Sequence, residues 1–296
     1  MCELEYRAAS AKSKAAGDEV LHRMKDVVLS TAAFLGDFPE RRRGTGTNGK
    51  FLDLGPPLVS ASEGEGPYDV WNPTYELTQF NFSLDLANKW RTRLGMPVNQ
   101  DWEHTRTNLA PLPIVDAPDG RGCSYKTYNR HQNCLPSVFA NKTSHCGGAT
   151  GSGMPTGTGH NSHPALNGAM GCLPGQLYGV DPEIMNNTLH ETLSVWSWDH
   201  CWGWDQPMVA MTATRLQQPQ VAVDTLLMPA TTNIYLPTGY NHPRPSGGIS
   251  AYLPGNGGIL IAVALMAGGW EGAPKGGAPG FPKEWKVQAE GFTPYF

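Results

Sequence analysis

The chain has 296 residues, and its 40% apolar and 16% charged residues are typical of a folded protein rather than a disordered one. A net charge of −4 excludes the strongly basic surface that nucleic-acid binding requires. The longest apolar run, Ile259 to Met266, is far too short to cross a membrane.

The first predicted elements are two helices separated by a long polar loop. Residues 18–35 carry apolar side chains at three- and four-residue steps, which predicts an amphipathic helix. A second helix is expected from Pro73 to about Leu94, with Asn72 as its N-cap and Gly95 as its stop signal. Two apolar stripes along this second helix predict that it is buried on two sides.

A short helix and an irregular insertion follow. Asn99 is expected to cap a helix over roughly residues 100–109. Residues 111–162 are rich in Pro, Gly and polar side chains, which predicts an irregular insertion with a small hairpin. The insertion contains three of the six cysteines, a pattern typical of a disulfide-tied segment: Cys123, Cys134 and Cys146.

Four more helical segments are predicted in the C-terminal half. They are expected at Asp181 to Trp196, at Met208 to Leu216, at Pro219 to Leu227, and at Ile259 to Gly268 after Asn256. The β–α alternation of a doubly wound sheet is absent. About eight helices, joined alternately by short turns and long loops, indicate an all-α helical toroid that forms a single domain over residues 1–296.

Glu63 is the first candidate for chemistry. It lies in a non-helical segment just before the second helix, with Tyr68 and Trp71 close by. Glycosidases need two carboxyl groups, one that protonates the leaving oxygen and one that acts as base or nucleophile. Glu63 is therefore a candidate acid, with Glu65 as its rival, and Trp71 is a candidate sugar-binding surface. The alternative is that Glu63 is a solvated loop residue.

A second cluster is formed by Trp202, Gly203, Trp204 and Asp205. The glycine lets the backbone turn, so that both indole rings are expected to face a groove and bind a sugar. Asp205 is a candidate base or a ligand for a sugar hydroxyl. The alternative is that Asp205 only caps the helix that starts at Pro207.

The remaining candidates lie toward the C-terminus. Tyr240, Asn241 and Asn256 are candidate substrate-binding residues, and Asn256 is alternatively the cap of the last helix. Glu290 follows Trp285 and is a candidate base, or else a solvated tail residue.

His160 and His163 have the spacing of a metal-binding pair. The sequence around them has no carboxylate pattern to complete a metal site. Neither a metal nor a cofactor is therefore predicted.

Six segments, in the same order, resemble the six-hairpin glycosidase superfamily. They are Gly55–Glu63 (GPPLVSASE), Asn72–Leu77 (NPTYEL), Asn108–Pro113 (NLAPLP), His163–Leu166 (HPAL), Trp202–Met208 (WGWDQPM) and Tyr252–Gly257 (YLPGNG). More narrowly, they are similar to bacterial and fungal glycoside hydrolase-like proteins related to the trehalase, maltose-phosphorylase and fucosidase barrels. The similarity spans about Glu3 to Pro294, apart from Cys123–Gly159.

This resemblance implies an (α/α)6 toroid with its general acid in the loop before the Asn72–Leu94 helix, where Glu63 matches. It leaves the base open between Asp205 and Glu290, and it favours Glu290 because relatives often draw their base from the last segment. It also implies inversion of configuration, which needs the two carboxyl groups about 6.5–9.5 Å apart. The expected partner is an oligo- or polysaccharide, with no nucleic acid and no membrane.

The chain departs from the family in its length. Six hairpins need twelve helices, and the sequence predicts about eight, so we interpret the chain as the C-terminal part of a longer enzyme. The N-terminus has no signal peptide, but the clustered cysteines and three sequons, at Asn81, Asn141 and Asn186, predict an extracellular parent protein. Two alternatives remain: a non-catalytic carbohydrate-binding or structural remnant, and a polysaccharide lyase.

Overall fold

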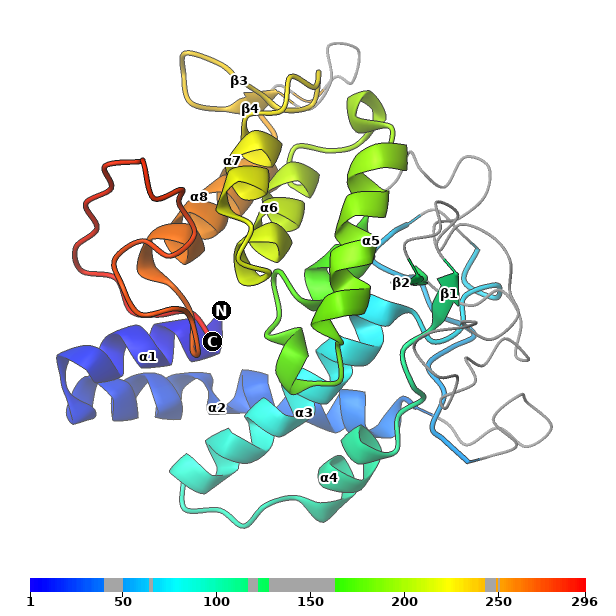
Figure 1. Cartoon of the computed structure of the whole chain (residues 1–296). Helices are drawn as coiled ribbons and strands as arrows, with labels where there is room; N and C mark the ends of the chain where they lie inside the picture. The colour runs from blue at the N-terminus through cyan, green and yellow to red at the C-terminus, as the bar shows by residue number, and fades with distance from the viewer. Residues whose placement is uncertain (40–49, 64–65, 117–121, 128–162, 243–248, 250) are drawn as a thin grey trace.

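The protein is mainly helical. The computed structural model describes residues 1–39, 50–63, 66–116, 122–127, 163–242, 249 and 251–296. These ranges contain eight α-helices and two sheets of two short strands each (Figure 1). The all-α class expected from the sequence is confirmed. None of the helices in these ranges is long and apolar enough to cross a membrane.

The first two helices form a hairpin joined at Ser13 (Figure 1). They are α1 (Cys2–Lys12) and α2 (Lys14–Asp37). The Ser13 hydroxyl accepts a hydrogen bond of 3.1 Å from the N–H of Ala16 and so caps α2. The helix predicted over residues 18–35 is confirmed, but it begins earlier. The sequence did not predict α1, because α1 carries few large apolar side chains.

The third helix is buried on two sides, as its stripes predict. α3 (Thr74–Arg93) packs against α2 and the short α4 (Gln100–Thr107) through one apolar face. On another face, Phe82 packs with Leu173 and Phe296. The Asn99 side chain accepts hydrogen bonds from two N–H groups at the start of α4, so its predicted capping role is confirmed.

Four further helices pack together in the C-terminal half (Figure 1). They are α5 (Pro182–Val195), α6 (Asp205–Arg215), α7 (Pro219–Leu226) and α8 (Leu253–Gly268). α6 contacts α5, α7 and α8, and all of its residues are buried. Two predicted starts are wrong: α6 begins at Asp205 rather than Met208, and α8 begins at Leu253, so that Asn256 lies inside it.

Two small hairpins complete the described fold. β1 (Ile114–Asp116) pairs antiparallel with β2 (Cys123–Tyr125), which confirms the small hairpin predicted in the insertion. β3 (Ile234–Tyr235) pairs antiparallel with β4 (Asn241–His242). Cys123 is disulfide-bonded. Most of the insertion, with Cys134, Cys146 and Asn141, lies outside the described residues.

A buried ion network around Glu3 fixes α1 to α3. The Glu3 side chain is 1% exposed and accepts hydrogen bonds from Arg7 at 2.8 Å, Arg93 at 2.6 Å and the Trp90 indole at 2.7 Å. Burial by itself raises the pKa of this carboxyl group. Hydrogen bonds from Arg93, Arg7 and Trp90 lower the pKa by more than burial raises it, so the net shift is downward. Arg7 also pairs with Glu271 at 2.6 Å, which brings the two termini together (Figure 1).

Candidate functional site

Four segments far apart in the sequence meet at the N-terminal ends of helices. They are the loop before α3, the segment before a short 3₁₀ helix, η2 (Ala165–Ala169), and the starts of α6 and α8. The backbone N–H of His163 donates to the Ser62 carbonyl at 3.4 Å, which joins the first two segments. The rings of Trp202 and Tyr252 lie 5.1 Å apart and join the last two.

Asp205 and His163 form a buried pair at the centre of this junction. The His163 Nδ1 atom lies 3.0 and 3.1 Å from the two carboxylate oxygens of Asp205. The side chain of Asp205 is fully buried, and that of His163 is 5% exposed. An ionised carboxylate only accepts hydrogen bonds, so Asp205 fixes a proton on Nδ1 and leaves the Nε2 lone pair free.

Asp205 also organises the turn that precedes it. Its carboxylate accepts a hydrogen bond of 2.8 Å from the backbone N–H of Trp202, and its own N–H donates to the Trp202 carbonyl at 2.9 Å. Burial raises the pKa of Asp205, and the charge of Glu63 adds to this rise. Hydrogen bonds from His163 and the Trp202 N–H oppose it. Asp205 is the first residue of α6 and does not cap a helix at Pro207.

Glu63 lies on the solvent side of this pair. Its carboxylate is 3.8 Å from the His163 Nε2 atom, and its side chain is 71% exposed. The Glu63 backbone adopts a left-handed conformation with φ of +56°, which is uncommon for a residue other than glycine. Such conformations cost about 1–3 kcal/mol and persist where the surroundings impose them, often at functional sites.

The loop that carries Glu63 is closed at its base by Asn72. The Asn72 backbone N–H donates to the Leu54 carbonyl at 2.9 Å, and its side-chain oxygen accepts from the Leu54 N–H at 2.8 Å. Its amide nitrogen donates to Asp53 at 2.8 Å. The prediction that Asn72 caps α3 is wrong, because Pro73 occupies the cap position and the Asn72 amide is engaged in the loop.

The tip of the same loop is fixed to α3 by Glu76. The Ala61 N–H donates to the Glu76 carboxylate at 2.5 Å. Burial raises the pKa of Glu76, although this hydrogen bond acts in the opposite direction. The hydroxyl groups of Ser60 and Ser62 are buried and hydrogen-bonded to each other at 2.6 Å. These contacts hold Glu63 beside His163.

Three aromatic side chains surround the cluster. The Trp204 ring packs on His163 with 4.6 Å between ring centroids, and its indole N–H hydrogen-bonds the Tyr252 hydroxyl. Burial, together with the charges of Asp205 and Glu63, raises the pKa of Tyr252 to about 12. Trp202 and Trp204 are therefore brought to the site, as expected, and Tyr252 joins them.

The asparagines predicted to bind substrate have structural contacts. Asn241 is fully buried, and its amide donates to the Thr232 and Ile234 carbonyls at 3.1 Å each. Asn256 accepts from the Asn241 N–H at 3.0 Å and donates to the Gly239 carbonyl at 2.7 Å. These bonds hold the β3–β4 hairpin against the start of α8.

The side chain of Asn241 also explains the glycine of the Trp-Gly-Trp turn. A Cβ atom at Gly203 would overlap the Asn241 side chain. Gly203 is therefore needed for close packing, in addition to the turn that the sequence predicted.

The structure does not bring the other predicted residues into the cluster. Trp71 is only 6% exposed and is part of the core. Tyr240 is 47% exposed on the β3–β4 hairpin. Glu290 lies in the segment that packs at Gly268, the far end of α8 from Tyr252, and its carboxylate accepts from Gln288 at 2.7 Å. α8 has 16 residues, so its two ends are about 24 Å apart. Glu65 and His160 lie outside the described residues.

From the sequence, His163 was weighed only as a possible metal ligand, and Tyr252 was not named as an individual site residue. Both lie in the segments that carry the family resemblance, which is the signal that points to them. Spacing alone gave no such signal, because His163 is 42 residues from Asp205 along the chain.

The cluster has the composition of a proton-transfer site. Glu63 presents an exposed carboxyl group, His163 presents a free ring nitrogen to it, and Asp205 fixes the ring from behind. Comparison of the sequence with models of protein families gives no match, and comparison with curated proteins gives none either.

Proposed function

We propose that the chain is part of a glycoside hydrolase of the six-hairpin type, whose helices form a portion of an (α/α)6 toroid. The meeting of η2 with the N-terminal ends of α3, α6 and α8 supports this, because it gathers the site at one end of the helices. α8 also supports an incomplete ring. It carries no charged residue, and it leaves Leu253, Leu260 and Val263 exposed.

The observation that carries the proposal is the contact between Glu63 and the buried His163–Asp205 pair. A glycosidic bond breaks when a carboxylic acid protonates the leaving oxygen. Of the two carboxyl groups in the cluster, only that of Glu63 reaches solvent, where a saccharide can approach. The proposed catalytic acid is therefore Glu63.

His163 and Asp205 are positioning residues in this account. Asp205 holds the proton on Nδ1, so the Nε2 lone pair faces the Glu63 carboxyl group and fixes the polarity of the surface beside it. In the reaction, the proton of Glu63 passes to the glycosidic oxygen as the bond from that oxygen to the anomeric carbon breaks. Glu63 is left as a carboxylate, and the saccharide fragment leaves as an alcohol.

An inverting reaction also needs a second carboxylate that acts as the base. Water attacks the anomeric carbon from the opposite face, and its proton passes to a second carboxylate about 6.5–9.5 Å from the acid. The geometry does not favour Asp205 for this role, because its carboxylate is buried behind His163 and occupied by hydrogen bonds from His163 and Trp202. Glu290 is on the opposite end of α8.

Tyr252 argues against the lyase alternative. A lyase of this kind uses a tyrosine as the base that removes a proton from a uronic acid. The pKa of Tyr252 is raised to about 12, so its hydroxyl stays protonated at neutral pH. The raised pKa of Tyr252 therefore disfavours the tyrosinate that such an elimination needs.

The disulfide bond of Cys123 supports an extracellular location for the parent protein, since stable disulfides are typical of oxidising compartments.

The test is hydrolysis of a panel of oligosaccharides by the wild-type chain and by Glu63→Gln. The variant keeps the shape of the side chain and cannot donate the acid proton. We expect activity to fall by at least about a hundredfold. The matched control is Glu183→Gln, an exposed glutamate on α5, which should keep wild-type activity.

Three other outcomes are informative. Equal activity of the wild type and Glu63→Gln would reject Glu63 as the acid. Binding of saccharides without any turnover, in a folded wild-type chain, would support the carbohydrate-binding remnant. Release of an unsaturated product, seen by ultraviolet absorbance, would support the lyase.

A further inference from the structure

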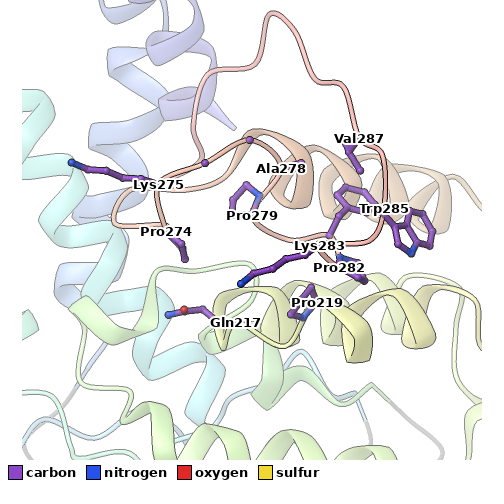
Figure 2. Close-up of a pocket in the computed structure, with 13 residues that line it drawn as sticks. Gln217, Pro219, Pro274, Lys275, Ala278, Pro279, Pro282, Lys283, Trp285 and Val287 are labelled. Carbon is purple, nitrogen blue, oxygen red and sulfur yellow. The ribbon is translucent and has the colours of Figure 1, made fainter.

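A hollow lies away from the Glu63 cluster, between the α6–α7 turn and the C-terminal segment. Its volume is about 520 Å³, and it is lined by Gln217, Pro219 and residues 274–279, 281–283, 285 and 287 (Figure 2). Asp205 begins α6 and Gln217 follows its end, so the 11 residues of α6 separate the two places by about 16 Å. The hollow is within the size range of small-molecule sites, about 300–1,000 Å³.

Prolines restrict part of the wall of this hollow. Four prolines contribute to it: Pro219, Pro274, Pro279 and Pro282. Proline fixes its own backbone angle, so these walls lose little conformational freedom when a ligand binds. Gln217 adopts φ of +59° because it ends α6, where the N–H of Gln218 bonds back to the Ala213 carbonyl. The backbone of Gln217 is thereby fixed at the rim.

Trp285 supplies an open aromatic face. Its side chain is 48% exposed, and its ring packs on Phe281 with 5.7 Å between centroids. Figure 2 shows the Trp285 ring at the edge of the hollow, beside Val287 and Pro282. A flat, half-exposed ring that is supported from behind by a second ring is suited to stacking on the face of a ligand.

Positive charge lies on the other side of the hollow. Lys275 and Lys283 both line it, and neither pairs with an acidic side chain among the described residues. Figure 2 shows Lys283 extending across the hollow toward Gln217 and Pro274. An ammonium group in this position attracts an anion.

Backbone donors add to this positive side. The N–H groups of residues 275–278 donate no hydrogen bond to any other part of the chain that the structure describes. Successive free N–H groups in a loop are a recurrent feature of anion-binding sites. The residues that line the hollow thus include backbone donors that are unpaired within the described chain and two lysines, together with a half-exposed aromatic ring.

We propose that this hollow binds an acidic sugar, a pyranose that carries a carboxylate or sulfate group. The charged group lies between the Lys283 ammonium and the free N–H groups of residues 275–278. The ring of the sugar stacks on Trp285, and the Gln217 amide bonds a hydroxyl group. This site is separate from the Glu63 cluster and does not depend on the hydrolase proposal.

Calorimetric titration of the full chain tests the proposal, with a uronate disaccharide as the probe. The matching neutral disaccharide, inorganic sulfate and adenosine monophosphate are the comparison ligands. We expect the uronate to bind at least about tenfold more tightly than the neutral sugar, with weaker binding at high salt. Preference for the nucleotide over the uronate, binding of inorganic sulfate as tight as the uronate, or equal affinity for both sugars would overturn the proposal.

Three variants locate the site. Trp285→Ala should weaken binding of the uronate about tenfold by removing the stacking face. Lys283→Gln should weaken it about fivefold by removing the partner of the anion. Lys286→Gln is the matched control, because Lys286 is an exposed neighbour that does not line the hollow, and its affinity should equal that of the wild type.

All of these side chains are exposed on a surface segment, so the variants should fold as the wild type does. Uronate binding unchanged in Trp285→Ala and Lys283→Gln would overturn the assignment to this hollow. Glu63→Gln separates the two sites: retained uronate binding supports the proposed one, and loss of binding would overturn it in favour of the Glu63 cluster.

Discussion

Asp205 holds the imidazole of His163 from behind, with Nδ1 only 3.0 and 3.1 Å from its two carboxylate oxygens. This relationship sets which nitrogen carries the proton. It also leaves the other nitrogen 3.8 Å from Glu63, the one carboxyl group of the cluster that reaches solvent. The tautomer of His163 is therefore the link between a buried pair and an exposed acid.

Replacement of Asp205 by asparagine should reverse this tautomer. The Trp202 N–H needs an acceptor, so the asparagine oxygen should face it and the NH₂ group should face Nδ1. Nε2 would then carry the proton and present a donor, instead of an acceptor, to the Glu63 side chain. We expect activity to fall about a thousandfold or more, as when the tautomer is wrong in other catalytic histidines.

Nitrogen NMR of His163 checks the tautomer directly, alongside the rate of hydrolysis. The exposed Asp224 on α7 gives a matched control, Asp224→Asn, which should leave both unchanged. An unchanged His163 tautomer in Asp205→Asn would contradict the role given to Asp205.

Glu76 should make stability depend on pH. Burial raises its pKa in the folded protein above the ordinary value of about 4.3. Its contribution to the free energy of unfolding is thus complete below that value and is lost as pH rises through the folded pKa. Glu76→Gln keeps an acceptor for the Ala61 N–H but cannot ionise. Denaturant titrations from pH 4 to pH 7 should show this variant gaining stability relative to the wild type as pH rises. A difference that stays constant with pH would contradict the raised pKa.

Glu3→Gln should destabilise the fold. The variant leaves Arg7 and Arg93 without their buried carboxylate, and breaking such a pair costs about 3–5 kcal/mol. The pKa of Glu3 is lowered, so this stabilisation is present at neutral pH and is lost as pH falls through the folded pKa. Glu5 lies on α1, as Glu3 does, but its ion pair with Arg23 of α2 is at the surface. Glu5→Gln should therefore change the free energy of unfolding by no more than about 1 kcal/mol. If Glu3→Gln and Glu5→Gln lowered the free energy of unfolding equally in urea titrations, the burial of the Glu3 ion pairs would contribute nothing to stability.

Gly203→Ala should damage both stability and the site. The new methyl group would overlap the buried Asn241 side chain, and overpacking of this kind costs about 1–3 kcal/mol. The backbone at residue 203 would have to move to relieve this overlap, and the Trp202–Asp205 turn would move with it. At Gly257, on α8, a Cβ atom meets nothing within 4 Å, so Gly257→Ala should be neutral or stabilise by up to about 1 kcal/mol. Thermal unfolding of both variants gives the comparison, and similar melting temperatures would contradict the packing argument.

Local sequence signals predicted the helices but not their connections. Asn99 caps α4 as expected, and Asp181, the predicted start of the next helix, caps α5. Both follow from local sequence, because capping depends on residues two or three positions away. Asn72 has the same local pattern, yet its amide bonds Leu54 and Asp53, which are 18 and 19 residues earlier. Hydrogen-bond partners at this distance along the chain cannot be predicted from the local sequence pattern.

The candidate site was likewise predicted from the sequence only in part. Glu63, Trp202, Trp204 and Asp205 were predicted, and the structure brings them together. Asn241 and Asn256 look like ligand-binding amides in the sequence, but their hydrogen bonds close a hairpin instead. The role of His163 depends on Asp205 and Glu63, both of which reach it only through tertiary folding.

The measurement that tests the central claim most directly is how the rate of hydrolysis by Glu63→Gln depends on the leaving group of the substrate. Protonation by Glu63 matters for an alcohol leaving group and little for fluoride, which departs without an acid. The account predicts that Glu63→Gln loses at least about a hundredfold on oligosaccharides and keeps most of its rate on the corresponding glycosyl fluoride. Equal losses on both substrates, or no loss on either, would contradict the assignment of Glu63 as the catalytic acid.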